Sequence, residues 1–177
     1  LVEVPTGRRW TYGELRTEVD AVALGLVAAG VEKGDRLGIW APNVAEWVLI
    51  QYATAKLGVV LVNINPAYRT HELEYVLKQA GISVLVAATA FKTSDYAAMI
   101  TEVRPNCPDL RRVVLIGTDD WEELVGPGRT GDPAELERRQ AALSPDDPIN
   151  IQYTSGTTGF PKGATLSHHN ILNNGYN

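Results

Sequence analysis

Residues 59–87 read VVLVNINPAYRTHELEYVLKQAGISVLVA, and this stretch decides the fold class. The runs 59–64 and 83–87 are apolar and rich in β-branched residues, which is typical of strands that are buried on both faces. Between them, residues 70–80 place apolar side chains on one face of a helix, and Gly81 is suited to end it. Strand, helix and strand in succession predict a βαβ unit with parallel strands.

The same alternation continues on both sides of this stretch. Further strands are expected at 36–40, 113–116, 149–153 and 163–167, and further helices at 11–30, 43–58, 94–103, from 133 onward and from 170 onward. The glycine- and proline-rich stretch 126–131 is expected to be a loop. The whole pattern predicts an α/β fold with a mainly parallel sheet and helices on both of its faces.

Three pairs of residues mark where helices should begin. Thr11 and Glu14 have the spacing of a capping box, in which each side chain bonds the other residue's backbone N–H. Asn43 has a glutamate at the same spacing and predicts that the second helix begins just after it. Asp132 precedes a proline, which is typical of an N-cap followed by the first helical position.

These patterns divide the 177 residues into three parts. Residues 1–10 suit a β-hairpin, residues 11–148 the alternating α/β region, and residues 149–177 a strand pair around a glycine-rich loop with the start of a helix. Residue 1 is Leu and the final helical stretch has no capping residue, so we expect an incomplete N-terminal domain whose C-terminal domain is absent. Uncovered apolar surface and an uncovered strand edge would favour a homodimer or another self-association.

Composition narrows the function class. Lysine and arginine total 16 against 21 aspartate and glutamate residues, a formal net charge of −5, which argues against nucleic-acid binding through a broad basic face. The longest apolar run, 21–31, is too short to cross a bilayer, and no export signal is visible. A cytoplasmic protein without a transmembrane segment is therefore expected. The single cysteine, Cys107, cannot form an internal disulfide and has no base beside it that would activate a thiol.

Residues 154–163 are the candidate anion-binding segment of the chain. They hold three glycines, four hydroxyl residues and one lysine between two apolar strands. Glycines allow backbone N–H groups to turn toward an anion, hydroxyls add donors, and a lysine adds a mobile positive charge. The candidate ATP-phosphate ligands are Thr154, Ser155, Gly156, Thr157, Thr158, Gly159, Lys162 and Gly163.

This segment differs from the two commonest nucleotide-binding loops. A Walker A loop has Gly-Lys followed by Ser or Thr and then a helix, whereas here Pro161 precedes Lys162 and Gly163 follows it. The dinucleotide fingerprint Gly-x-Gly-x-x-Gly is absent. Composition alone leaves open the alternative of a flexible linker with one solvated lysine.

Residues 153–163, Tyr-Thr-Ser-Gly-Thr-Thr-Gly-Phe-Pro-Lys-Gly, resemble the phosphate-binding signature of the adenylate-forming superfamily. That superfamily contains acyl-CoA synthetases, luciferases and peptide-synthetase adenylation domains. Residues 9–15, 34–43 and 62–68 resemble successive landmarks of its large N-terminal domain. The resemblance covers the whole chain apart from a loosely matching stretch, 117–132.

Within that superfamily, residues 65–68, 72–77, 147–152 and 163–168 look most like medium-chain fatty acyl-CoA synthetases. The resemblance implies that a fatty acid reacts with ATP and Mg²⁺ to give an acyl-adenylate and pyrophosphate, and that coenzyme A then takes the acyl group. Residues 154–158 and Lys162 would hold the β- and γ-phosphates.

Several parts of the resembled enzymes are missing from the sequence. The Tyr-Gly-x-Thr-Glu segment, the ribose-binding aspartate segment, the hinge and the C-terminal lysine do not occur, so we expect this fragment alone to be inactive and assign it no catalytic residue. His168 and His169 would face opposite sides of a strand, so no metal site is assigned either. An adenylation domain that loads an amino or aryl acid onto a carrier protein, or a non-catalytic binding module, stays an alternative.

Overall fold

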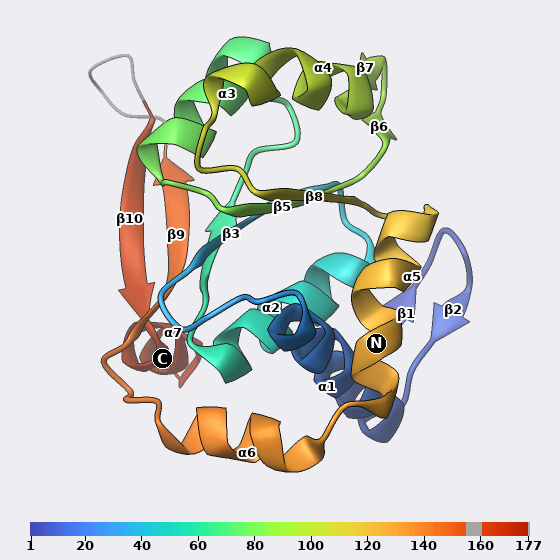
Figure 1. The fold of residues 1–177 in the computed structure, drawn as a ribbon, viewed down its shortest axis with the longest axis vertical. Coiled ribbons are helices and arrows are strands. Elements are labelled where there is room, and N and C mark those ends of the chain that lie inside the picture. The colour runs from blue at the N-terminus through green and yellow to red at the C-terminus, as the bar shows by residue number, and fades with distance from the viewer. Residues whose placement is uncertain (155–160, 177) are drawn as a thin grey trace.

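A six-stranded sheet lies at the centre of the protein in the computed structural model, which describes residues 1–154 and 161–176 (Figure 1). Its strands are β3 (Arg36–Trp40), β4 (Val60–Asn63), β5 (Val84–Ala87), β8 (Arg112–Leu115), β9 (Pro148–Thr154) and β10 (Lys162–Ser167). They lie in the order β10-β9-β4-β3-β5-β8, and every neighbouring pair is parallel except β9 with β10. The prediction of a mainly parallel sheet is therefore confirmed.

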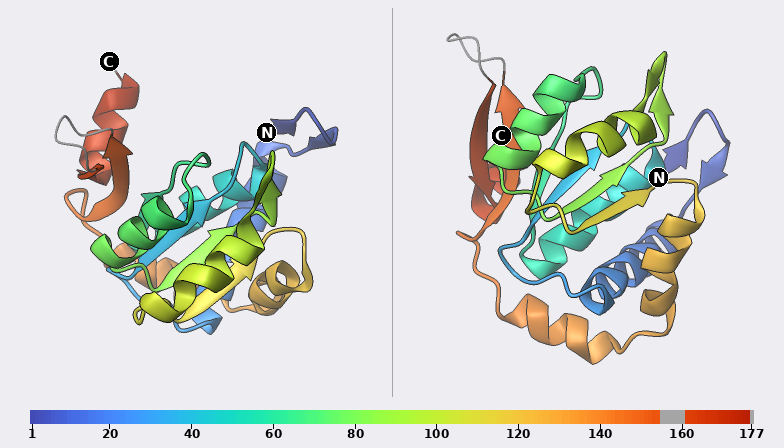
Figure 2. Two further views of the ribbon diagram at one scale, coloured as in Figure 1. Left: turned by 90° about the horizontal axis from the view of Figure 1, so that it is seen from above. Right: turned by 45° about the horizontal axis from the view of Figure 1, so that its top comes forward.

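Helices cover both faces of this sheet (Figures 1 and 2). On one face lie α1 (Tyr12–Ala28), α2 (Ala45–Leu57), α5 (Asp119–Val125) and α6 (Pro133–Ala141), and on the other lie α3 (Thr70–Gln79) and α4 (Tyr96–Val103). Alternate residues of each strand enter the two cores: Val84 and Val86 pack toward α1 and α2, and Leu85 packs toward α3 and α4. Burial on both faces explains why these strands are continuously apolar.

The remaining elements are short. They are β1 (Val2–Glu3), β2 (Arg8–Arg9), β6 (Ala90–Phe91), β7 (Ser94–Asp95), the 3₁₀ helices η1 (Arg104–Asn106) and η2 (Gly126–Thr130), and α7 (His168–Tyr176). The strands β1 and β2 form the expected N-terminal hairpin. The stretch that was expected to be a loop around residue 128 is a 3₁₀ helix that packs on α1.

The strand order of the sheet reverses between β3 and β5, because β4 and β5 lie on opposite sides of β3. Trp40, the last residue of β3, and Tyr96, the first residue of α4, are fully buried, and their ring centroids are 3.5 Å apart with 6° between the ring planes. The indole N–H of Trp40 donates to the carbonyl oxygen of Asn65, 3.1 Å away. This contact anchors the segment between β4 and α3.

The start of α2 differs from the prediction. The N-cap residue is Val44 rather than Asn43, and it has no capping side-chain hydrogen bond. Instead, the backbone N–H of Ala45 donates to Oε1 of Glu3 at 2.8 Å. The β1–β2 hairpin thus brings a carboxylate from 42 residues away to the helix N-terminus, and a local spacing rule cannot anticipate that.

Two other helix starts are also shifted. Helix α4 begins at Tyr96 instead of 94, because Ser94 and Asp95 pair with β6 and Asp95 then caps the helix. Helix α7 begins at His168 instead of 170, so the two adjacent histidines lie in a helical turn and not on a strand.

Candidate functional site

The strands β9 and β10 form an antiparallel hairpin whose connecting segment carries the glycine-rich signature. Thr154, the last residue of β9, pairs with Lys162, the first residue of β10. The hydroxyl of Thr154 donates to the backbone oxygen of Lys162 at 3.4 Å. The β-hairpin context agrees with the sequence prediction that the segment joins strand to strand, and it excludes a helix that begins at Lys162.

The structure places three of the eight predicted phosphate ligands: Thr154, Lys162 and Gly163. The other five, Ser155, Gly156, Thr157, Thr158 and Gly159, lie outside the described residues.

Thr154 and Lys162 are both exposed at the end of the hairpin. Within the described part of the chain, the Lys162 ammonium group has no ion-pair partner. A lysine without an ion-pair partner among these residues, at the same end of the hairpin as a threonine hydroxyl, suits an anion with several oxygens, such as a phosphate.

Gly163 has a packing role that the sequence did not indicate. It pairs with Tyr153 across the hairpin, and a Cβ atom at this position would lie 2.8 Å from Cγ2 of Ile151 and 3.4 Å from Cζ of Tyr153. The missing side chain therefore leaves room for the Tyr153 ring. Its predicted contact with phosphate stays a prediction.

Helix α3 contacts the hairpin through residues that sequence reasoning missed. The hydroxyl of Tyr153 donates to Oε1 of Gln79 at 2.9 Å, and the hydroxyl of Tyr75 donates to the backbone oxygen of Pro161 at 3.4 Å. Burial, followed by the nearby phenols of Tyr75 and Tyr68, raises the pKa of Tyr153 to about 12. Tyr153 is therefore a protonated donor at neutral pH. The i, i+4 spacing of Tyr75 and Gln79 on the partly exposed side of α3 was the available signal.

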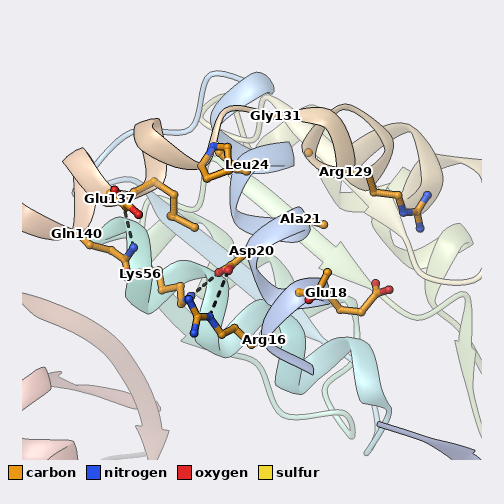
Figure 3. A pocket seen from close by; sticks show the side chains of 14 residues that line it. Arg16, Glu18, Asp20, Ala21, Leu24, Lys56, Arg129, Gly131, Glu137 and Gln140 are labelled. Atoms are coloured by element: carbon orange, nitrogen blue, oxygen red, sulfur yellow. Dashed lines mark hydrogen bonds and ion pairs between the residues drawn. The ribbon is translucent and has the colours of Figure 1, made fainter. Parts of the chain in front are cut away.

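A hollow of about 570 Å³ lies between α1, α2, η2 and α6, on the face of the sheet opposite to α3 (Figure 3). Three of its charged side chains interact with one another: Asp20 pairs with Lys56 and lies 3.9 Å from Nε of Arg16. The hollow shares no residue with the β9–β10 hairpin. It is therefore not an extension of the signature site.

The described residues contain no group of three His, Cys, Asp or Glu side chains that could hold a metal ion. His169 Nδ1 lies 3.6 Å from Oδ1 of Asp146, and Nε2 of His168 is buried without a hydrogen-bond partner in the described structure.

No helix within residues 1–154 and 161–176 is long and apolar enough to cross a membrane. Burial raises the pKa of the Cys107 thiol, which keeps that thiol protonated.

Comparison with protein families gives a match over the entire chain. Residues 1–177 match the family described as AMP-binding enzyme. The mitochondrial medium-chain acyl-CoA ligase ACSF2 of Homo sapiens is 46% identical over 193 residues, which cover 98% of this chain and 31% of that protein. The ACSF2 of Danio rerio is 43% identical over 194 residues, which cover 99% of this chain and 32% of that protein.

Solved structures agree with these relatives. The inhibitor-bound N-terminal domain of FACL13 from Mycobacterium tuberculosis superposes with a TM-score of 0.78 at 29% identity, over 94% of this chain and 39% of that one. ATP-bound MatB from Rhodopseudomonas palustris superposes with a TM-score of 0.74 at 31% identity, over 97% of this chain and 32% of that one. The chain thus spans about a third of the length of the curated relatives it matches.

Proposed function

Since the chain belongs to the AMP-binding enzyme family, we propose that it is the N-terminal part of a fatty-acid–CoA ligase acting on a medium-chain fatty acid. The observation that carries this proposal is the β9–β10 hairpin, which presents Thr154 and Lys162 at the two ends of the signature, the Lys162 ammonium group having no ion-pair partner within residues 1–154 and 161–176. The relatives named medium-chain acyl-CoA ligases support the choice of substrate.

In the proposed reaction, a carboxylate oxygen of the fatty acid attacks the α-phosphorus of ATP, and the bond from that phosphorus to the bridging oxygen of pyrophosphate breaks. The thiol of coenzyme A then attacks the acyl carbon and releases AMP. Lys162 and Thr154 stabilise the negative charge that develops on the departing pyrophosphate. We propose that Mg²⁺ binds together with ATP, whose phosphate oxygens are ligands that this ion prefers; within residues 1–154 and 161–176 no three His, Cys, Asp or Glu side chains are grouped as a metal site of their own.

The experiment that tests this function is ATP–pyrophosphate exchange by the full-length protein with a panel of carboxylic acids. The panel contains short-, medium- and long-chain fatty acids, aromatic acids and amino acids. We expect the fastest exchange with medium-chain fatty acids, followed by formation of the acyl-CoA when coenzyme A is added. Exchange with amino or aryl acids alone would identify a carrier-loading adenylation domain, and no exchange with any acid would identify a binding module.

Cellular location and assembly are further parts of the proposal. We propose a cytoplasmic location for the full-length protein, which agrees with the buried, unpaired state of Cys107, the single cysteine of residues 1–177, although the relatives named above are mitochondrial proteins. A fluorescent fusion of the full-length protein separates the two compartments. We also propose that the chain can form a homodimer through the exposed edge strand β10 and the exposed apolar side chains of α7.

A further inference from the structure

Helix α3 holds both arms of the signature hairpin. On the β9 arm, Tyr153 bonds Gln79, and on the β10 side Tyr75 bonds the backbone oxygen of Pro161, the residue before Lys162. Figures 1 and 2 show α3 beside the end of the hairpin where Thr154 and Lys162 pair. Two side chains one helical turn apart therefore fix the hairpin next to both of its exposed phosphate-ligand candidates.

The neighbouring packing makes these contacts specific. Gly163 leaves room for the Tyr153 ring, so the ring lies over the hairpin and its hydroxyl reaches α3. Helix α3 is itself rigidly seated, because Leu73, Val76 and Leu77 are almost fully buried in the core. A support built on a packed helix holds a binding group more precisely than a loop does.

We infer that Tyr75, Tyr153 and Gln79 are positioning residues that hold Lys162 and Thr154 in place for the phosphates of ATP. None of the three needs to contact ATP, because each acts through the hairpin backbone or through another of the three. The inference rests on the proposed function for its ligand and on the contacts described above for its geometry.

The first test measures both half-reactions of the full-length protein with Tyr153→Phe and Tyr75→Phe. Each variant keeps the ring and removes only the phenol hydroxyl, so we expect kcat/KM for ATP in adenylation to fall about 3- to 10-fold. Thiolysis of purified acyl-adenylate should stay within about twofold, because pyrophosphate has left before that step. Equal losses in both half-reactions would overturn the inference in favour of general destabilisation.

A double-mutant cycle tests the Tyr153–Gln79 contact directly. Gln79→Ala should reproduce the loss seen with Tyr153→Phe, and the double variant should be no worse than either single one. Tyr52→Phe is the matched control, because Tyr52 is a half-exposed tyrosine on α2, on the opposite face of the sheet. Additive losses at positions 79 and 153, or an equal loss with the control, would contradict the proposed pairing.

Hydrogen exchange gives a readout that does not depend on activity. In Tyr75→Phe and Tyr153→Phe, backbone amides at 152–154 and 162–164 should exchange faster, while those of β3 and β5 should keep wild-type rates. If the wild-type protein shows no pyrophosphate exchange but these amides exchange hydrogen faster in the two variants, the proposed function fails and the positioning role stands. If the wild-type protein is active and neither readout changes in the variants, the positioning role fails.

Discussion

At the scale of single residues, Lys162 is the signature residue whose side chain we expect to contribute most to adenylation. We expect Lys162→Ala in the full-length protein to lower adenylation about 100-fold, the lower end of the range for losing one prearranged donor to a developing anion. Thiolysis of purified acyl-adenylate should change less, because this lysine's partner has then departed. Single-turnover kinetics of the two half-reactions measures the difference.

The control for this prediction is Lys92→Ala, which removes an exposed lysine near the β6–β7 turn and should change either rate less than about threefold. A loss in Lys162→Ala that is equal in both half-reactions would refute a role at pyrophosphate. No loss in either would return the segment to the flexible-linker alternative.

Hydrogen bonds made by individual side chains could be predicted from the sequence only where both partners are close together in the chain. The capping box of Thr11 and Glu14 is present as predicted, with the backbone N–H of Thr11 donating to Oε2 of Glu14 at 2.8 Å. The cap of α2 was predicted wrongly, because Glu3 comes from a distant hairpin. The tyrosine support of the signature was missed for the same reason: Tyr75 and Pro161 are 86 residues apart.

At the scale of elements, α1 and η2 touch backbone to backbone. A Cβ atom on Gly128 would lie 1.8 Å from the carbonyl oxygen of Ala21 and 2.5 Å from the nitrogen of Gly25. Neither backbone can move aside, so we expect Gly128→Ala to lower the free energy of unfolding by about 3 kcal/mol or more. Gly126→Ala is the matched control in the same 3₁₀ helix, because nothing lies within 4 Å of its added Cβ atom.

Thermal unfolding followed by circular dichroism compares the two glycine variants. The control should lie within about 0.5 kcal/mol of wild type, whereas Gly128→Ala should melt at a clearly lower temperature. Equal melting temperatures would mean that η2 does not pack on α1 as described. The sequence predicts a loop here because glycine and proline are typical of turns, whereas the tertiary contact that requires Gly128 cannot be read from the neighbouring residues.

The N-terminal hairpin is joined to α2 by charge, which makes its attachment depend on pH. Hydrogen bonds from Arg8, then Thr6, outweigh burial and lower the pKa of Glu3 from 4.5 to about 2. A carboxyl group with a lowered pKa in the folded state stabilises that state fully above about pH 4.5 and loses this effect as the pH falls toward 2. Glu3→Gln should therefore cost about 1–3 kcal/mol at pH 7 and progressively less between pH 4.5 and 2.

The measurement is the melting temperature of wild type and Glu3→Gln over that pH range. Glu102→Gln, at an exposed glutamate on α4, is the control and should track the wild-type protein throughout. A difference between wild type and Glu3→Gln that stays constant from pH 7 to pH 2 would show that the carboxylate charge is not what holds the hairpin.

At the scale of the whole molecule, the sequence predicted the layers but not the strand order. Apolar runs alternating with amphipathic helices require a parallel sheet between two helical layers, and that is the observed architecture. The order places β9 beside β4, although the two strands are far apart in the chain and β5 and β8 lie between them in sequence. Strand order depends on which crossover buries each helix best, and periodicity carries no information about that choice.

The two edges of this sheet are protected unequally. At the β8 edge, the backbone N–H of Leu115 donates to Oδ2 of Asp120, so a side chain occupies part of that edge. At the other edge, the first four residues of β10 are exposed, and the adjacent α7 exposes 74% of Leu172 and 92% of Tyr176. An open strand edge beside exposed apolar side chains favours pairing with a second copy of the chain.

We therefore expect residues 1–177, produced as a separate chain, to form dimers or larger species whose population rises with concentration. Leu172→Lys places a charge on the exposed side of α7 and should shift the population toward monomer, because a buried charge opposes association. Tyr12→Ser is the control, since it removes an exposed aromatic side chain from the first residue of α1, and α1 lies away from β10 and α7 (Figure 1). Sedimentation velocity over a concentration series measures the populations. A wild-type chain that stays monomeric at every concentration would show that this edge is already protected against pairing, and an equal effect of Tyr12→Ser would place the contact elsewhere on the surface.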